Sequence, residues 1–324
     1  MDLVLDFERP IVELRKRIDQ LKDLEEANGV NLAASIAQLE VQAERLRERI
    51  FSRLTPWQRT QLSRHPGRPY TLDYVKALCT EWTEMHGDRG GVDDHAIVSG
   101  LARFRERPVA VIGHQKGRNT KENLFRNFGM ARPEGYREAL RIMKLAERFG
   151  MPILTFIDTP GAYPGVEAEA HGQAEAIARN ILEMARLKVP VIALVIGEGG
   201  SGGALALGVA NRVLMLENAI YSVISPEGCA AILWRDRAEG HRAAAALRIT
   251  AADCFDLGVI DEVIPEPGGA AHRNLEETMR RVGDTLARHL DELAGMDGAA
   301  LAADRYDRFR VLGRLREGVE PGSP

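Results

Sequence analysis

Residues 189–210 read VPVIALVIGEGGSGGALALGVA, and this stretch decides the fold. An apolar run of strand length meets a cluster of glycines, which opens into a small-residue pattern typical of a closely packed helix. Five glycines leave backbone amides unshielded at the start of that helix: Gly197, Gly199, Gly200, Gly202 and Gly203. Amides at a helix N-terminus lack intrahelical partners and favour negative charge, so the stretch predicts a site for an anion or an oxyanion.

Two other interpretations of the same glycines stay open. Residues 199–203 fit the G-x-S-x-G nucleophile elbow, with Ser201 as nucleophile and His241 or His272 as base, which would make the chain a serine hydrolase. A close packing turn between strand and helix would also need glycine for steric reasons. A Walker phosphate loop is excluded, because no Lys followed by Ser or Thr closes the cluster, and the dinucleotide fingerprint lacks its glycine spacing.

The composition favours a globular protein that acts on small molecules or proteins. The chain has 324 residues, 45% of them hydrophobic, and a formal net charge of -4, so no global field favours nucleic acid or an anionic membrane. Its three cysteines lie far apart, which predicts neither a disulfide framework nor a zinc site, and we expect no metal on this chain. An acidic N-terminus and the lack of a 20-residue apolar run predict a cytoplasmic protein.

The N-terminal part has the pattern of a helical hairpin. In residues 11–55 apolar residues recur at intervals of three and four, and Asn28-Gly29 supplies a turn between the two helices. Each helix has one apolar stripe, which we expect to pack against the other helix and against another body, as an assembly arm. We therefore divide the chain into an N-terminal helical region with linker, residues 1–88, and a catalytic domain with C-terminal helices, residues 89–324.

The rest of the chain alternates between strand and helix patterns. We expect strands at residues 96–104, 108–113, 153–157, 191–196 and 212–216, and helices at 134–149, 167–187 and from the glycine turn to 210. Strands separated by helices predict an α/β fold with parallel crossovers. Two loops, residues 158–165 and 197–203, then follow the carboxyl ends of buried strands, where ligands of such folds bind, so we expect them to share one cleft.

Few side chains near these loops are convincing catalysts. Asp158 ends a buried strand, where it could act as a base, although capping the following Thr-Pro-Gly turn is the favoured interpretation. Tyr163 fits a wall of the cleft better than a proton donor. A loop with few apolar residues carries four cations that could meet phosphates or an acidic partner, or form a solvated face: Lys116, Arg118, Lys121 and Arg126.

With these residues in hand, the chain closely resembles the alpha subunits of bacterial acetyl-CoA carboxylase carboxyltransferases, a branch of the crotonase-like superfamily. The matching runs follow one another over most of the chain: RPYTLDYV at 68–75, IGHQKGR at 112–118, NFGM at 127–130, FIDTPGAYPG at 156–165, GEGGSGGALA at 197–206, YSVISPEGCA at 221–230 and IDEVIPEP at 260–267. One local departure is AEAHGQ at 168–173, where the family often reads AEERGQ and has a charge pair.

The resemblance implies a fold, a reaction and partners. The fold would be a crotonase/ClpP-like superhelix of β-β-α units preceded by the helical hairpin. The reaction would transfer a carboxyl group from carboxybiotin, held on a biotin carboxyl carrier protein and not attached to this chain, to the CoA thioester acetyl-CoA, giving malonyl-CoA for fatty-acid synthesis. The chain would act only with a beta subunit, as an α2β2 assembly that works with biotin carboxylase. A zinc ribbon would sit on beta.

The resemblance also implies roles for backbone atoms. The amides of Gly202 and Gly203 would form an oxyanion hole for the ureido oxygen of biotin, and amides of the beta subunit would hold the thioester oxygen. Substrate contacts would come from both loops, at Gly161, Ala162, Tyr163, Pro164 and Gly165 and at Gly199, Gly200 and Ser201. A serine hydrolase using Ser201 and a non-catalytic scaffold subunit stay as alternatives.

Overall fold

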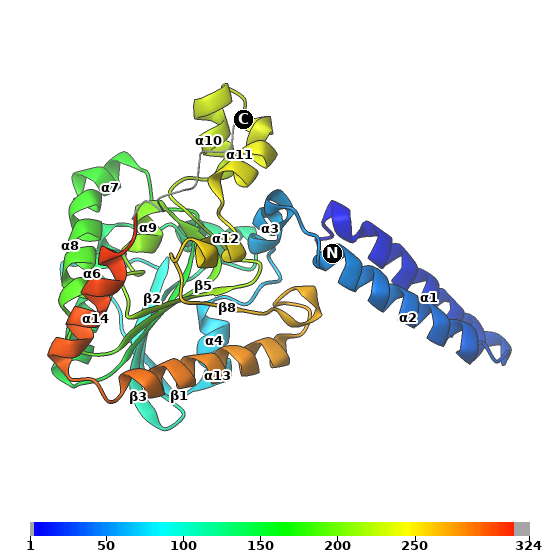
Figure 1. Ribbon diagram of the computed structural model, residues 1–324, viewed down its shortest axis with the longest axis horizontal. Helices are drawn as coiled ribbons and strands as arrows, with labels where there is room; N and C mark the ends of the chain where they lie inside the picture. The colour runs from blue at the N-terminus through cyan, green and yellow to red at the C-terminus, as the bar shows by residue number, and fades with distance from the viewer. Residues whose placement is uncertain (1–2, 314–324) are drawn as a thin grey trace.

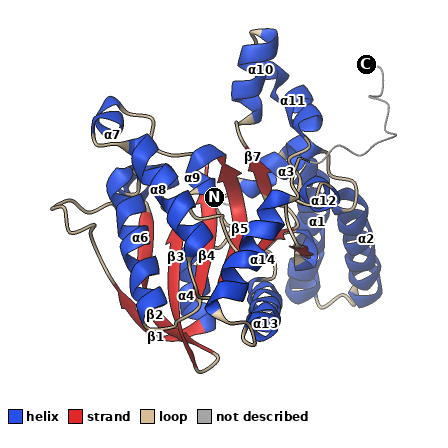
Figure 2. Cartoon of the chain, turned by 60° about the vertical axis from the view of Figure 1, so that its left-hand side comes forward, coloured by secondary structure: helices blue, strands red, loops and turns tan. Residues whose placement is uncertain are grey.

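Eight strands form one mixed sheet in the computed structural model, which describes residues 3–313 (Figure 2). The strands are β1 (Cys79–Glu84), β2 (Ile97–Phe104), β3 (Arg107–His114), β4 (Ile153–Thr159), β5 (Val191–Gly200), β6 (Arg212–Leu216), β7 (Ile220–Ser222) and β8 (Glu262–Ile264). Their order is β1-β2-β3-β4-β5-β6-β8, and β7 pairs with the C-terminal end of β5. The first two pairings are antiparallel and all the others are parallel.

Helices cover both faces of this sheet, and further helices precede its first strand and follow its last. They are α1 (Arg9–Asn28), α2 (Ala33–Phe51), α3 (Pro56–Ser63), α4 (Thr71–Leu78), α5 (Thr120–Phe125), α6 (Pro133–Arg148), α7 (Val166–Ala170), α8 (Gln173–Arg186), α9 (Ser201–Leu205), α10 (Pro226–Trp234), α11 (Gly240–Leu247), α12 (Ala251–Asp256), α13 (Leu275–Leu293) and α14 (Gly298–Arg310). Short 3-10 turns lie at Asp6–Glu8, Asn127–Gly129, Arg237–Glu239 and Pro267–Gly269.

Neighbouring residues of β3 show which helices lie on which face. Gly113 has no room for a side chain because Thr71 of α4 fills the space, whereas the ring of His114 lies edge-on to Tyr136 of α6. Successive residues of a strand point to opposite faces, so α4 and α6 cover opposite sides of the sheet. The parallel strands are therefore buried on both faces, which explains the unbroken apolar run in β5.

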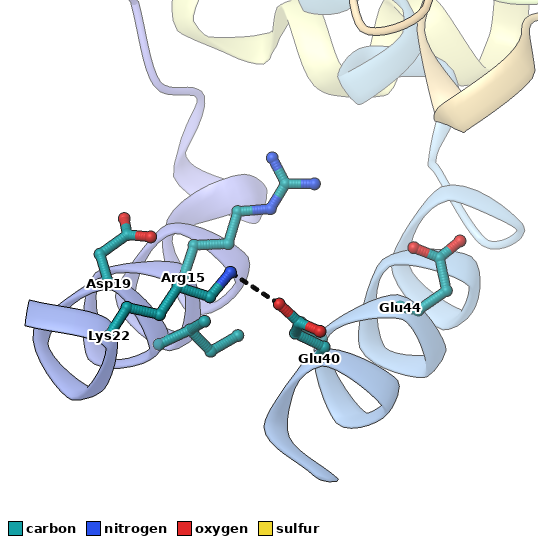
Figure 3. A pocket seen from close by; sticks show the side chains of 7 residues that line it. Arg15, Asp19, Lys22, Glu40 and Glu44 are labelled. Atoms are coloured by element: carbon teal, nitrogen blue, oxygen red, sulfur yellow. Dashed lines mark hydrogen bonds and ion pairs between the residues drawn. The ribbon is translucent and has the colours of Figure 1, made fainter. Parts of the chain in front are cut away.

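The α1–α2 hairpin projects away from the sheet as a narrow arm (Figure 1). Its two helices bury their apolar stripes against each other, around Ile18, Ile36 and Ala43. At its base Phe51 and Leu54 join Ile11, Leu62 and Ala270 in a second small core. Further out, a shallow pocket between the helices is lined by exposed charges, of which Lys22 and Glu40 pair at 2.8 Å (Figure 3). The predicted hairpin is thus present, with its stripes turned inward.

The predicted α/β class is confirmed, and the ends of two predicted helices need correction. β1 belongs to the sheet although it lies within residues 1–88, so the sheet begins before the predicted domain boundary, which itself stays a prediction. The helix expected at 167–187 is split into α7 and α8 at Gly172, whose left-handed φ of 84° separates the two helices. The helix expected from the glycine turn to 210 has only the five residues of α9. Residues 1–2 and 314–324 of the predicted domains lie outside the described residues.

Candidate functional site

The glycine cluster is divided between a strand and a helix. Gly197 and Gly199 lie within β5, so the prediction that all five glycines lie at the helix start is wrong for these two, whereas Gly200 ends β5 and is the N-cap of α9. Ser201 has a φ of 53°, and this left-handed residue turns the chain sharply from β5 into α9. No described side chain caps α9, so Gly202 and Gly203 present their amides in an uncapped first turn.

The loop at residues 159–165 lies directly against this turn. A Cβ atom on Gly200 would be 2.2 Å from the carbonyl oxygen of Pro160, and one on Gly203 would be 2.5 Å from the nitrogen of Ala162. Real Cβ atoms do not approach other atoms this closely, so both positions require glycine for the two backbones to meet. The close packing interpretation of the glycines is therefore correct for these two, and it is compatible with a binding role.

Hydrogen bonds hold the second loop in place. The Tyr163 amide donates to the Ala131 carbonyl at 2.9 Å, and Gln173 donates to the carbonyl oxygens of both Ala131 and Tyr163. The Arg132 guanidinium lies over the Tyr163 ring, 4.9 Å from its centroid. Thr159 Oγ1 accepts from the Gly161 amide at 3.1 Å and so caps the turn, which is the role predicted for Asp158.

An open, mostly apolar cavity of 390 Å³ adjoins the first turn of α9. Its lining combines the site turn with residues from β7, α11 and α12 and the chain around them: Ser201, Gly202, Leu205, Tyr221, Ser222, Val223, Leu247, Arg248, Ile249, Cys254, Leu257 and Val259. Val223, one of these lining residues, is 76% exposed. The site thus has backbone donors at one end and an uncovered apolar wall at the other.

β5 carries a two-residue bulge just before the glycine turn. Ile157 of β4 pairs with Val195, but Thr159 pairs with Gly199, so three residues of β5 stand opposite Asp158 alone. Charged side chains satisfy the backbone of this bulge. Arg68 donates to the Ile196 carbonyl at 2.9 Å and pairs with the buried Glu266 at 2.7 Å.

Lys116 bridges two buried carboxylates at the same place. Its ammonium lies 2.7 Å from Asp158 Oδ1 and 2.9 Å from Glu198 Oε2. Burial opposes the charge of Lys116, but the two carboxylates outweigh it and raise the lysine pKa above its ordinary value. Burial likewise opposes ionisation of Glu198, and Lys116 and Arg64 reverse this and lower its pKa. Lys116 and Glu198 are therefore charged at neutral pH.

The four cations of the basic loop do not form one cluster. Lys116 is turned inward, and Arg118 donates to the carbonyls of Pro66 and Arg68 at 2.8 and 2.7 Å and pairs with Asp73. Arg126 is half-buried and donates to the His95 carbonyl at 2.9 Å. The side chain of Lys121 is exposed on α5. Of these four cations, only Lys121 is surrounded by solvent, as the interpretation of the loop as a solvated face predicted for all of them.

The geometry does not favour a serine hydrolase. The left-handed Ser201 does resemble a nucleophile elbow. However, the two candidate bases are engaged elsewhere: the ring of His272 stacks on His65 with centroids 4.1 Å apart, and His241 Nδ1 lies 3.4 Å from the Ala238 carbonyl oxygen. A triad needs its base within hydrogen-bond reach of the nucleophile.

A buried histidine behind the site could not be found from sequence. His114 is fully buried beside Tyr136, whose hydroxyl would be 2.9 Å from a Cβ on Gly203. Burial, with a contribution from the Lys116 charge, lowers the His114 pKa to about 3, so the ring is neutral. The other unusual histidine is His171, at the departure from the family pattern, where Nδ1 contacts the Glu134 carboxylate at 2.8 Å.

The described residues contain neither a metal-ligand cluster nor a helix suited to a bilayer. Within residues 3–313 no three side chains of the metal-binding types gather closely enough to hold an ion. Across the same residues, no helix combines the length and the apolar character that crossing a bilayer requires.

Comparison with known proteins matches nearly the whole chain. Residues 4–313 match a family described as acetyl co-enzyme A carboxylase carboxyltransferase-like. The acetyl-coenzyme A carboxylase carboxyl transferase subunit alpha of Syntrophotalea carbinolica is 57% identical over 318 residues, covering 98% of this chain and 100% of that protein. The protein of the same name from Thermus thermophilus is 56% identical, covering 97% and 99%.

Solved structures support the fold at lower identity. The transcarboxylase 12S hexamer core matches 70% of this chain with a TM-score of 0.58 and 20% identity, although the chain spans only 42% of that protein. A Pseudomonas malonate decarboxylase hetero-tetramer, solved with coenzyme A, matches 67% of this chain and 88% of its own with a TM-score of 0.53 and 23% identity. The near-complete match to named relatives decides the family: the chain belongs to the alpha subunits of acetyl-CoA carboxylase carboxyltransferase.

Proposed function

We propose that this chain provides one half of a divided carboxyltransferase site. The reaction is transfer of a carboxyl group from carboxybiotin on a biotin carboxyl carrier protein to acetyl-CoA, giving malonyl-CoA. The family name of the relatives denotes a subunit of a multi-subunit enzyme. The partners proposed here are a beta subunit, in an α2β2 assembly, together with the carrier protein and biotin carboxylase. A cytoplasmic location stays a prediction.

The uncapped first turn of α9 carries this proposal. Gly202 and Gly203 are the two amides that follow the left-handed Ser201, and Ser201 and Gly202 line the apolar cavity of 390 Å³. A urea-like oxygen needs fixed N–H donors, and the rings attached to it need an apolar wall, so this chain's residues fit the carrier's biotin group. Biotin supplies the carboxyl group and an oxygen on which negative charge grows during transfer.

The amides act by being fixed before the reaction. They donate to the ureido oxygen as its charge develops, and because the turn is already rigid they need no reorganisation at that moment. One donor of this kind is typically worth about 3 to 4 kcal/mol in the transition state. Gly199, Gly200 and Ser201 set the direction of the turn, and residues 161–165 form the neighbouring wall.

The other half of the site belongs to the partner. Exposed apolar residues surround the cavity, with Val223 at 76% and Leu257 at 51% exposure, so the wall around the amides is incomplete in this chain alone. We propose that amides of the beta subunit hold the thioester oxygen and that most CoA contacts lie there as well. No metal is needed on this chain for this role.

The deciding experiment measures malonyl-CoA formation from acetyl-CoA and carboxybiotin. Three samples are compared: this chain alone, its candidate beta partner alone, and the two mixed. We expect activity only in the mixture. Activity of this chain alone would overturn the divided site, and a stable but inactive mixture would favour the scaffold alternative. Full activity after substitutions throughout residues 159–165 and 199–203 would also favour the scaffold.

A further inference from the structure

A compact set of buried charges stands directly before the glycine turn. Lys116 lies between Asp158 and Glu198, and Glu198 also pairs at 2.7 Å with Arg64, which follows α3. Arg64 in turn pairs with Glu227 at the start of α10. The side chains of Lys116, Asp158 and Glu198 are 12%, 3% and 9% exposed. Any catalytic role for these charges rests on the proposed function of the Gly202 and Gly203 amides.

The charges replace the strand pairing that the bulge of β5 has lost. Opposite the bulge, Asp158 Oδ1 accepts the Glu198 amide at 2.9 Å, and this same oxygen accepts from the Lys116 ammonium. Glycine is required at position 197, where a Cβ would lie 2.5 Å from that oxygen. The backbone of Glu198 is thus fixed by a side chain of β4 instead of by the regular ladder.

Lys116 is the element that allows this arrangement. Two carboxylates brought together in a buried place repel each other, and each loses its hydration, unless a cation lies between them. With the ammonium in place, both carboxylates are held by hydrogen bonds of ordinary length. The ammonium therefore connects the end of β3, through Lys116, with the ends of β4 and β5.

We infer that Lys116 is a positioning residue: acting through Asp158 and Glu198, it fixes the bulge of β5 and thereby aims the Gly202 and Gly203 amides. Only three residues separate Glu198 from Gly202, so a shift of the bulge is passed directly to the turn. This assignment removes Lys116 from the candidate phosphate contacts of the basic loop.

The test uses Lys116→Met in the complex with the beta partner. Met keeps the length and apolar stem of the side chain but removes the ammonium. We expect kcat for malonyl-CoA formation to fall at least about tenfold, because small misplacements of fixed donors are costly. The KM for acetyl-CoA should stay within about twofold, since a positioning residue does not touch that substrate. Amide hydrogen exchange of a peptide covering 195–205 should become faster.

A matched control separates aiming from general stability. Arg305 is also fully buried, and it donates to the carbonyls of Met184, Leu187 and Val189 at the opposite end of β5. Arg305→Met should lower the melting temperature but leave kcat, measured below that temperature, unchanged. If Lys116→Met does not fold, Glu198→Gln keeps the shape of the cluster and should show the same changes to a smaller degree.

The outcomes are distinct for the two proposals. Unchanged kcat with unchanged exchange at 195–205 in Lys116→Met overturns the positioning role. A raised KM for acetyl-CoA with unchanged kcat also overturns it and restores Lys116 as a substrate contact. If the unmodified mixture makes no malonyl-CoA, the proposed function fails, while the exchange experiment still decides whether Lys116 fixes the bulge.

Discussion

Gly203 packs its backbone against Ala162 so closely that a Cβ atom on the glycine would lie 2.5 Å from the Ala162 nitrogen. The same atom would be 2.9 Å from the Tyr136 hydroxyl. The turn that carries the proposed donors and the loop at residues 159–165 are therefore one packed unit. Any side chain at position 203 must displace the turn or the loop, because moving the Ala162 backbone or the buried Tyr136 ring costs free energy.

The first prediction concerns this contact. Gly203→Ala should lower malonyl-CoA formation by the mixed subunits about 100-fold, and Gly203→Val should abolish it, because the amide is displaced from its aim. Assembly with the partner, measured by size-exclusion chromatography with light scattering, should persist. Gly295→Ala is the matched control, since a Cβ there meets nothing within 4 Å. Near-normal turnover by Gly203→Val would falsify the oxyanion role of this turn.

A second prediction concerns the exposed Ser201. Ser201→Ala should retain malonyl-CoA formation within about threefold, because the proposed donors are backbone amides, which remain. A fluorophosphonate probe, read by intact mass spectrometry, should leave the unmodified chain unlabelled. Covalent labelling at Ser201, lost in the Ala variant, would instead establish a hydrolase.

The buried His114 makes a third prediction, on stability against pH. Its pKa is about 3 in the folded chain against 6.5 as the ordinary value, so below pH 6.5 the unfolded chain binds a proton that the folded chain does not. Stability is therefore lost as the pH falls from 6.5 towards 3. His114→Phe removes the titrating imidazole. The decrease in the free energy of unfolding between pH 7.5 and 5.0 should therefore be smaller by about 2 kcal/mol.

Urea unfolding of both chains at the two pH values measures this difference. Other titrating groups, such as His272 with its pKa lowered to about 4 and Glu138 with its pKa raised to about 7, are present in both chains and cancel in the comparison. Burial is the leading cause of each of these shifts. Equal losses in the two chains would show that His114 is protonated in the folded state as readily as in the unfolded state.

A fourth prediction addresses the helical arm. Lys22 and Glu40 face each other across the hairpin, so residues 23–39 can be replaced by a short Gly-Ser turn without disturbing its base. We expect the shortened chain to keep the melting temperature of the body, because Phe51 and Leu54 still pack against Leu62 and Ala270. Its assembly with the beta partner should weaken. Undiminished assembly in sedimentation experiments would remove the arm from the interface.

Much of the fold can be predicted from periodicity, because long buried elements have strong patterns. The helix expected at 134–149 occupies Pro133–Arg148 as α6, and the hairpin of β2 and β3 agrees to within a residue or two. The errors lie where tertiary contacts override the local pattern. The small residues after the glycine turn favour a helix to 210, yet α9 ends at Leu205 and the chain tightens into a turn.

The sequence predicts the glycine turn of the site but not the charged residues that hold it. Glycine spacing marks the turn, because glycine is needed wherever backbones meet or turn sharply. The charged partners of that turn come from positions 42 to 134 residues apart in the chain, so no local pattern joins Lys116 to Asp158 or Arg64 to Glu198. The same holds for His114, whose surroundings come from α6 and the glycine turn.

The bulge of β5 contains an even number of extra residues, and this affects the side chains that follow it. Between the paired positions Ile157–Val195 and Thr159–Gly199, β5 uses two more residues than β4. Since strand side chains alternate with a period of two, two extra residues preserve which face each following side chain points to. Deleting one of residues 196–198 would reverse those faces, whereas deleting two of them would keep the faces and straighten the strand. In this segment, therefore, only changes of chain length by two residues keep the alternation of side-chain faces along β5.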